Sequence, residues 1–254
     1  MTESERTESE APGGWDAGPG REPGARGRRF DAAVRAYLER RPEATVVALG
    51  EGLGTGFWRL DNGRLNWLTV VPPETAAVRR ILLPDSARRR TVARAVTDHG
   101  WLDAVREPGR GVIVTARGVL MRLPPPAVRA LLAACAERFP GGALVFDAPP
   151  RRAAVRARWA GGAVGRWPAP VRWGLDRAQL PRVAGAHPGI VAVREVGPPP
   201  AAPAAPRRTA PGGLPARLVW PVRRIPVLGA LMPLVCEVRF APAGSPRRAS
   251  SAVS

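Results

Sequence analysis

The stretch Val46–Leu60, VVALGEGLGTGFWRL, joins a short apolar run to a loop in which four glycines stand at every second position. An apolar run bounded by glycines is typical of a buried strand, and glycines after such a strand let the backbone approach a ligand closely. The dinucleotide-binding fingerprint G-x-G-x-x-G needs a third glycine where this chain has Thr55 or Phe57, depending on the register. We therefore expect the loop to approach a cofactor that lacks a pyrophosphate.

Strand and helix patterns alternate on both sides of this loop. Apolar, β-branched runs predict strands at residues 45–50, 65–71, 91–96, 111–116, 143–148, 190–196 and 236–240, the last of them at a sheet edge. Helical spacing of apolar residues predicts helices at residues 30–41, 73–83, 124–139 and 176–183. The alternation predicts an α/β fold with a Rossmann-like, mainly parallel sheet and helices on both faces.

The composition divides the chain into one domain and two tails. Residues 1–29 are rich in Glu and Ser and then in Gly, Pro and Arg, with almost no apolar side chains to bury, so we expect a disordered tail. Residues 30–241 form the expected domain, and residues 242–254 form a second flexible tail. Within the domain, residues 151–172 are rich in arginine and glycine and residues 198–215 in proline, so both are expected to be irregular.

The basic composition excludes two classes of enzyme. The formal net charge is +18, and all 39 basic residues are arginine, as expected for a protein encoded by a GC-rich genome. Without lysine, the chain cannot form a P-loop or the Schiff base of a pyridoxal enzyme. Cys135 and Cys236 lack metal-ligand spacing, as do His99 and His187, so we expect two buried, reduced thiols and no metal site.

Arginine runs raise the alternative of nucleic-acid binding. Such runs occur at Arg88–Arg90, Arg151–Arg152 and Arg223–Arg224, but no RNA-binding signature accompanies them. We therefore expect solvated faces and no nucleic-acid partner. The segment Met1–Glu10 is acidic and polar, and the chain contains no run of 18 apolar residues, so we expect a cytoplasmic protein without a membrane partner.

Several motifs in order resemble one known family. The matching stretches are FDAAVRAYLERRPEATVVALGEGLGTGFWRLDNGRLNWLTV, PETAAVRRILLPDSARRR, TDHGWLDAV, GVLMRL, AERFPGGALVFDAPPR and RWGLD. Between Phe30 and Phe240 the chain resembles the class I methyltransferases grouped with leucine carboxyl methyltransferases and polyketide O-methyltransferases. The resemblance implies a seven-stranded sheet with an antiparallel last strand, S-adenosylmethionine as the cofactor, and methyl transfer to oxygen of a small-molecule acceptor.

The resemblance also implies which residues contact the cofactor. They are four residues of the glycine loop and four later positions: Gly50, Glu51, Gly52, Gly54, Val71, Glu74, Asp98 and Arg117. Val71 stands where the family carries an acidic residue for the ribose hydroxyls, and we expect it to face the cleft. Glu74 could replace that acid if the turn shifts. Glu51 is interpreted either as part of the site or as a solvated loop charge.

The remaining site positions also have two interpretations. Asp98 corresponds to a residue beside the adenine, but it is equally placed to cap the helix before Trp101. Arg117 stands at an acidic position of the family and Arg122 at a tyrosine. The sequence assigns no catalytic base, because Asp147, at a strand end, is interpreted as a turn or capping residue.

Two functions therefore remain open. One is an S-adenosylmethionine-dependent O-methyltransferase acting on a small-molecule hydroxyl or carboxylate. The other is a methyltransferase fold that has lost its cofactor chemistry and serves as a binding or scaffolding protein. The second is favoured by Val71 and by the segment 1–29, which stands where family members carry a helical lid.

Overall fold

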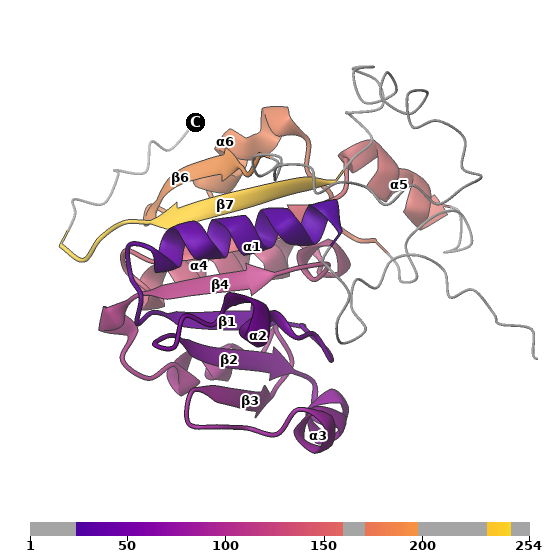
Figure 1. Ribbon diagram of the computed structural model, residues 1–254. Coiled ribbons are helices and arrows are strands. Elements are labelled where there is room, and N and C mark those ends of the chain that lie inside the picture. Colours follow the sequence, from indigo (N-terminus) through magenta and orange to yellow (C-terminus); the bar gives the residue numbers. More distant parts are fainter. Residues whose placement is uncertain (1–23, 160–170, 198–232, 245–254) are drawn as a thin grey trace, which may run out of the picture.

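A computed structural model describes residues 24–159, 171–197 and 233–244 (Figure 1). Within these residues, seven strands form one sheet in the order β3-β2-β1-β4-β5-β7-β6. The strands are β1 (Thr45–Leu49), β2 (Asn66–Val71), β3 (Arg89–Ala93), β4 (Val112–Ala116), β5 (Ala143–Ala148), β6 (Ile190–Glu195) and β7 (Leu234–Phe240). The seven-stranded α/β sheet expected from the sequence is thereby confirmed.

The sheet is parallel from β3 to β5 and antiparallel around β7. Strand β1 pairs in parallel with both β2 and β4, whereas β7 runs antiparallel to β5 and to β6. The antiparallel last strand is therefore confirmed, but its expected position at the edge is wrong. β7 lies between β5 and β6, and all but one of its residues are buried. Burial along nearly the whole strand is typical of a sheet interior.

The helices cover both faces of the sheet (Figure 1). They are α1 (Ala25–Leu38), α2 (Gly56–Leu60), α3 (Pro73–Leu82), α4 (Pro125–Arg138), α5 (Arg151–Trp159) and α6 (Leu180–Ala184), with short 3-10 turns η1 (His99–Ala104), η2 (Pro108–Arg110), η3 (Leu120–Arg122) and η4 (Arg177–Gln179). Because side chains alternate along a strand, Val46 packs with α1 on one face, whereas Val47 packs with α4 on the other. Both cysteines are free and buried, and burial raises the pKa of the Cys236 thiol to about 12.

Two segments differ from the sequence expectation. Helix α1 begins at Ala25, five residues before the expected domain boundary, and residues 1–23 lie outside the described residues. Helix α5 occupies part of a segment expected to be irregular, because its alanines and arginines are strong helix formers. No helix in the described ranges is both long and apolar enough to cross a bilayer.

The arginine run before and within β3 is part of the fold, which corrects the expectation of a solvated face. Arg88 makes two hydrogen bonds to the carboxylate of Asp61, at 2.5 and 2.8 Å. Arg89 is buried, and its guanidinium lies 4.2 Å from the centroid of the Trp58 ring. Arg90 donates to the carbonyl oxygen of Ala104 at 2.7 Å. These three guanidinium groups are therefore engaged within the domain.

Candidate functional site

The strand order reverses at β1, and this position defines a crevice. Strands β2 and β3 lie on one side of β1, whereas β4 and β5 lie on the other. In open parallel sheets, ligands bind outside the carboxyl ends of the strands at such a switch point. The glycine loop follows β1 there, and the segment Arg117–Val119 follows β4. The two loops touch, because a Cβ added at Gly50 would lie 2.7 Å from Cγ2 of Val119.

The first two glycines of the loop are needed for its backbone shape. Gly50 has φ +62° and Gly52 has φ +60°, a left-handed conformation that other residues rarely adopt. Within the residues that the structure describes, a Cβ added at Gly52 would meet nothing within 4 Å. The next residue, Leu53, is 45% exposed. This part of the loop is therefore open to an incoming molecule.

The next two glycines serve a different purpose, because they make room for Glu51. A Cβ at Gly54 would lie 2.6 Å from Cγ of Glu51. A Cβ at Gly56 would lie 2.6 Å from Oε1 of Glu51 and 2.8 Å from the ring of Trp67. The glycine spacing suggested close approach of a ligand. At Gly54 and Gly56, however, the space is filled by the side chain of Glu51, which belongs to the loop itself.

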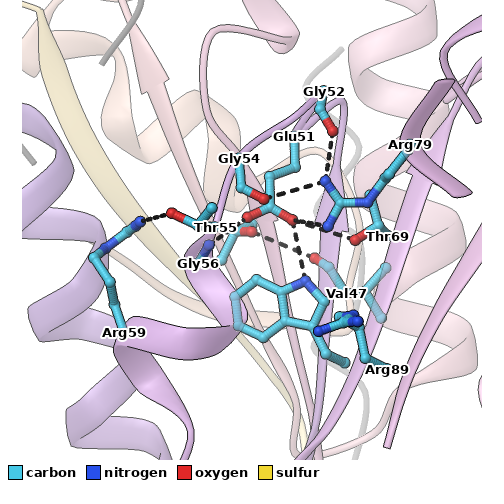
Figure 2. A network of polar contacts seen from close by, with 12 residues as sticks. Val47, Glu51, Gly52, Gly54, Thr55, Gly56, Arg59, Thr69, Arg79 and Arg89 are labelled. Atoms are coloured by element: carbon cyan, nitrogen blue, oxygen red, sulfur yellow. Dashed lines mark hydrogen bonds and ion pairs between the residues drawn. The ribbon is translucent and has the colours of Figure 1, made fainter. Parts of the chain in front are cut away.

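Glu51 occupies this space and bonds inward, as Figure 2 shows. Its Oε1 accepts from the backbone N–H of Gly56 at 2.9 Å. Its Oε2 accepts from Nε1 of Trp67 at 3.1 Å and from the hydroxyl of Thr69 at 3.2 Å. The same oxygen lies 3.4 Å from Nη2 of Arg79. With only 9% of its side chain exposed, Glu51 is not the solvated charge that one interpretation assumed.

Arg79 completes the network from α3. Its side chain is 1% exposed, and its Nη1 donates to the carbonyl oxygens of Gly52 at 2.5 Å and of Gly54 at 3.1 Å. Burial lowers the pKa of the Arg79 guanidinium, and the nearby charge of Glu51 opposes that shift. The buried Nε of Arg79 has no hydrogen-bond partner among the described residues. A buried cation thus connects the loop to the helix that follows β2.

The sequence did not reveal the role of Arg79, because α3 exposes its large apolar residues and buries a charged one. The helix buries Ala76 and Arg79, whereas Val78, Ile81 and Leu82 are 47%, 80% and 58% exposed. Apolar periodicity would have turned the opposite face inward. A charged residue three positions after a buried alanine carries no signal of burial by itself.

The positions expected beside the ribose differ in accessibility. Val71, the last residue of β2, is 1% exposed, so the expectation that its side chain faces an open cleft is wrong. Glu74 is exposed in the first turn of α3, three residues later. In that turn a carboxylate is also stabilised by the helix dipole. Glu74 therefore offers an exposed carboxylate near the carboxyl end of β2, whereas Val71 offers a buried apolar side chain.

Asp98 and Arg117 follow β3 and β4 respectively. The Asp98 carboxylate caps η1 by accepting from the N–H of Gly100 at 3.0 Å, and it pairs with Arg94 at 2.6 Å. Both interactions lower the pKa of Asp98, the backbone bond more than the ion pair. The capping interpretation is thereby confirmed. Arg117 is half-buried; burial raises the pKa of Asp147, and the charge of Arg117 is a minor influence that opposes this rise.

Sequence reasoning missed a second buried ion pair at the carboxyl ends of β4 and β5. Asp147 is fully buried, accepts from the N–H of Gly118 at 2.5 Å, and pairs with Arg26 at 2.9 Å. Burial raises the pKa of Asp147, and the Arg26 cation opposes that rise. The turn or capping role expected for Asp147 is found in its bond to Gly118. Arg26 was missed because it fell within the segment expected to be disordered.

Comparison with known proteins finds one curated relative in sequence and several solved structures with a similar fold. No protein-family model matches the chain. The chain is 30% identical over 124 residues to the tetracenomycin polyketide synthesis O-methyltransferase TcmP of Streptomyces glaucescens, a match covering 48% of this chain and 46% of TcmP. The match thus spans about half the length of that relative. It confirms the resemblance to polyketide O-methyltransferases.

Solved structures give the fold. The crystal structure of a candidate methyltransferase from Thermobifida fusca YX aligns with a TM-score of 0.59 and 15% identity, covering 85% of this chain and 80% of that one. The two proteins therefore share their fold. The N-methyltransferase NodS from Bradyrhizobium japonicum WM9 aligns with a TM-score of 0.49 and 11% identity, covering 86% and 98% of the two chains.

The residues of the loop can be compared with S-adenosylmethionine, the cofactor that the resemblance in sequence implies. The open backbone at Gly52 and Leu53 suits close approach by a ligand without a pyrophosphate. The ribose hydroxyls need an acceptor, which buried Val71 does not offer and exposed Glu74 does. A fit to this cofactor would therefore rest on the backbone of the loop and on Glu74.

Proposed function

We propose that this protein is an S-adenosylmethionine-dependent O-methyltransferase acting on a small-molecule hydroxyl or carboxylate. The observation that carries the proposal is the open, positive-φ loop at Gly50 and Gly52, which lies at the switch point of a methyltransferase fold. The match to a polyketide O-methyltransferase supports oxygen as the methyl acceptor and secondary metabolism as its setting. The cofactor, the methyl transfer and the acceptor class are all part of the proposal.

In this proposal the chain holds the cofactor with few side chains. The backbone of the loop receives the methionine part, Glu74 accepts from the ribose hydroxyls, and Asp98 lies toward the adenine. The cofactor, when bound, supplies an activated methyl group. Because Asp98 is already engaged with Gly100 and Arg94, Glu74 is the carboxylate with the larger expected contribution to affinity.

The acceptor needs to arrive with its oxygen ionised or close to ionisation. Asp147 is fully buried and held by Arg26 and Gly118, and Asp176 is held in the capping box of η4. Neither carboxylate is placed as a free general base. A carboxylate acceptor needs only positioning, whereas a hydroxyl needs its proton removed during the transfer. The proposal therefore gives carboxylates and acidic hydroxyls preference over alcohols.

A second candidate is a methyltransferase fold that binds or scaffolds without the cofactor. The observation that favours it is the inward bonding of Glu51 together with the burial of Val71, since neither side chain is free for a ligand. Calorimetric titration with S-adenosylhomocysteine separates the two candidates without knowledge of the acceptor. Micromolar affinity supports the enzyme, and no heat at millimolar ligand supports the scaffold.

A further inference from the structure

We propose that Glu51 and Arg79 are positioning residues that turn two peptide groups of the glycine loop so that the N–H groups of Leu53 and Thr55 point away from the core, as donors for a ligand oxygen. The inference deepens the proposed function, because it assigns the donors of the same site. It concerns the geometry of the loop in the free protein, so it can also be tested without any cofactor.

The argument starts from the carbonyl oxygens that Arg79 holds. Its Nη1 binds the carbonyl oxygens of Gly52 at 2.5 Å and of Gly54 at 3.1 Å, so both point toward the buried guanidinium (Figure 2). In a planar trans peptide, the C=O of one residue and the N–H of the next point in opposite directions. The N–H groups of Leu53 and Thr55 therefore point away from Arg79.

The exposure of the loop agrees with this direction. Leu53 is 45% exposed, and no atom of the described part of the chain lies within 4 Å of a Cβ added at Gly52, so the donor of Leu53 lies on the open side. Thr55 is half-buried, and its hydroxyl is 3.4 Å from Nη1 of Arg59. Two backbone donors on alternate residues suit a carboxylate or hydroxyl oxygen of a bound molecule.

Glu51 is needed because Arg79 is buried. A guanidinium that is 1% exposed requires a counter-charge, and the carboxylate of Glu51 at 3.4 Å supplies it. Glu51 also binds Gly56 N–H at 2.9 Å, while its own carbonyl accepts from Gly54 N–H at 3.0 Å. Removing either charge leaves the other buried without its partner. The pair and the loop conformation should therefore be lost together.

The first experiment replaces Arg79 by methionine, with Arg80→Met as the matched control. Arg80 is exposed on the same helix and donates to Thr91 O at 3.3 Å, away from the loop. Hydrogen exchange of the ligand-free protein is followed at the amides of Gly54 and Gly56. We expect protection to fall at least about tenfold in Arg79→Met and to change by less than about twofold in Arg80→Met. Equal protection in both variants would overturn the positioning role.

The second experiment tests the donors themselves in the wild-type protein. If S-adenosylhomocysteine binds, the amides of Leu53 and Thr55 should gain protection, and its affinity should be about tenfold weaker in Arg79→Met than in Arg80→Met. Binding without added protection at these two amides would refute the assignment of donors while the proposed function stands. Absence of binding to the wild type would refute the proposed function, and the ligand-free exchange would still decide the positioning role.

A double variant distinguishes positioning from stability alone. Glu51→Gln with Arg79→Met removes both buried charges, so urea unfolding should show a recovery relative to Arg79→Met. Protection of Gly54 and affinity for S-adenosylhomocysteine should nevertheless stay low, because the carbonyl oxygens of the loop have lost their donor. Recovery of protection together with stability would contradict the proposal. If Arg79→Met does not fold, Arg79→Lys takes its place. Lysine keeps the positive charge but lacks the guanidinium, whose two terminal nitrogens bind the loop carbonyls and Glu51.

Discussion

The glycines at positions 52 and 54 should differ in what they contribute, and substituting each by alanine measures the difference. At Gly54 the new Cβ would lie 2.6 Å from Cγ and 3.0 Å from Oε1 of Glu51, and Gly54 does not have a positive φ. The carboxylate must therefore move, which separates it from Arg79. Breaking a buried ion pair by displacing one partner costs about 3 kcal/mol. We expect Gly54→Ala to lower the free energy of unfolding by about that amount.

At Gly52 the expected cost is smaller and has another origin. Its Cβ would meet no atom of residues 24–159, 171–197 or 233–244 within 4 Å, so only the left-handed backbone at φ +60° is penalised. A left-handed non-glycine residue costs about 1–2 kcal/mol. Urea unfolding followed by far-UV circular dichroism measures both variants, and the Glu51→Ala background supplies the control. There Gly54→Ala should cost much less, because no carboxylate remains to be displaced. A Gly54→Ala cost equal in both backgrounds would refute the role assigned to Gly54.

Three further predictions concern single carboxylates. Glu74→Ala should change the free energy of unfolding by less than about 0.5 kcal/mol and weaken S-adenosylhomocysteine about tenfold in calorimetry; unchanged affinity would exclude Glu74 as the ribose acceptor. Val71→Asp should destabilise the fold by about 3 kcal/mol in urea, because Val71 is 1% exposed, and normal stability would show that this side chain reaches solvent. Burial raises the pKa of Asp147 above its ordinary value of 3.8, so the unfolded state ionises first as the pH rises. The free energy of unfolding should then fall with pH from about 4 up to the folded pKa in the wild type, and this slope should be absent in Asp147→Asn.

The parts of the fold that the sequence predicted are those with strong periodicity. Strands β1, β4 and β5 are mostly apolar and short, so their type and approximate bounds followed from pattern alone. The place of β7 between β5 and β6 did not follow, because strand order depends on long-range pairing. A strand next to the end of the chain carries the same local pattern in the middle of a sheet as at its edge.

The site was predicted less well, because its main interactions connect distant residues. Glu51 and Arg79 are 28 positions apart and meet only when α3 packs beside the loop. Arg26 and Asp147 are 121 positions apart, and the helix that carries Arg26 begins within a segment rich in glycine and arginine. The sequence located the loop and the carboxyl ends of the strands. It gave no signal for which charges the fold would bury.

Because of the buried pair Glu51–Arg79, the conformation of the glycine loop is not by itself evidence of cofactor binding. Because Glu51 and Arg79 hold the loop from within, the loop can keep its shape whether or not a cofactor binds. A chain that had lost cofactor chemistry could therefore retain Gly50, Gly54 and the whole network for stability alone. A residue distinguishes the enzyme from the scaffold only if it contributes to cofactor binding and not to the stability of the fold. Glu74 would meet that criterion if its removal left the free energy of unfolding unchanged and weakened the binding of S-adenosylhomocysteine.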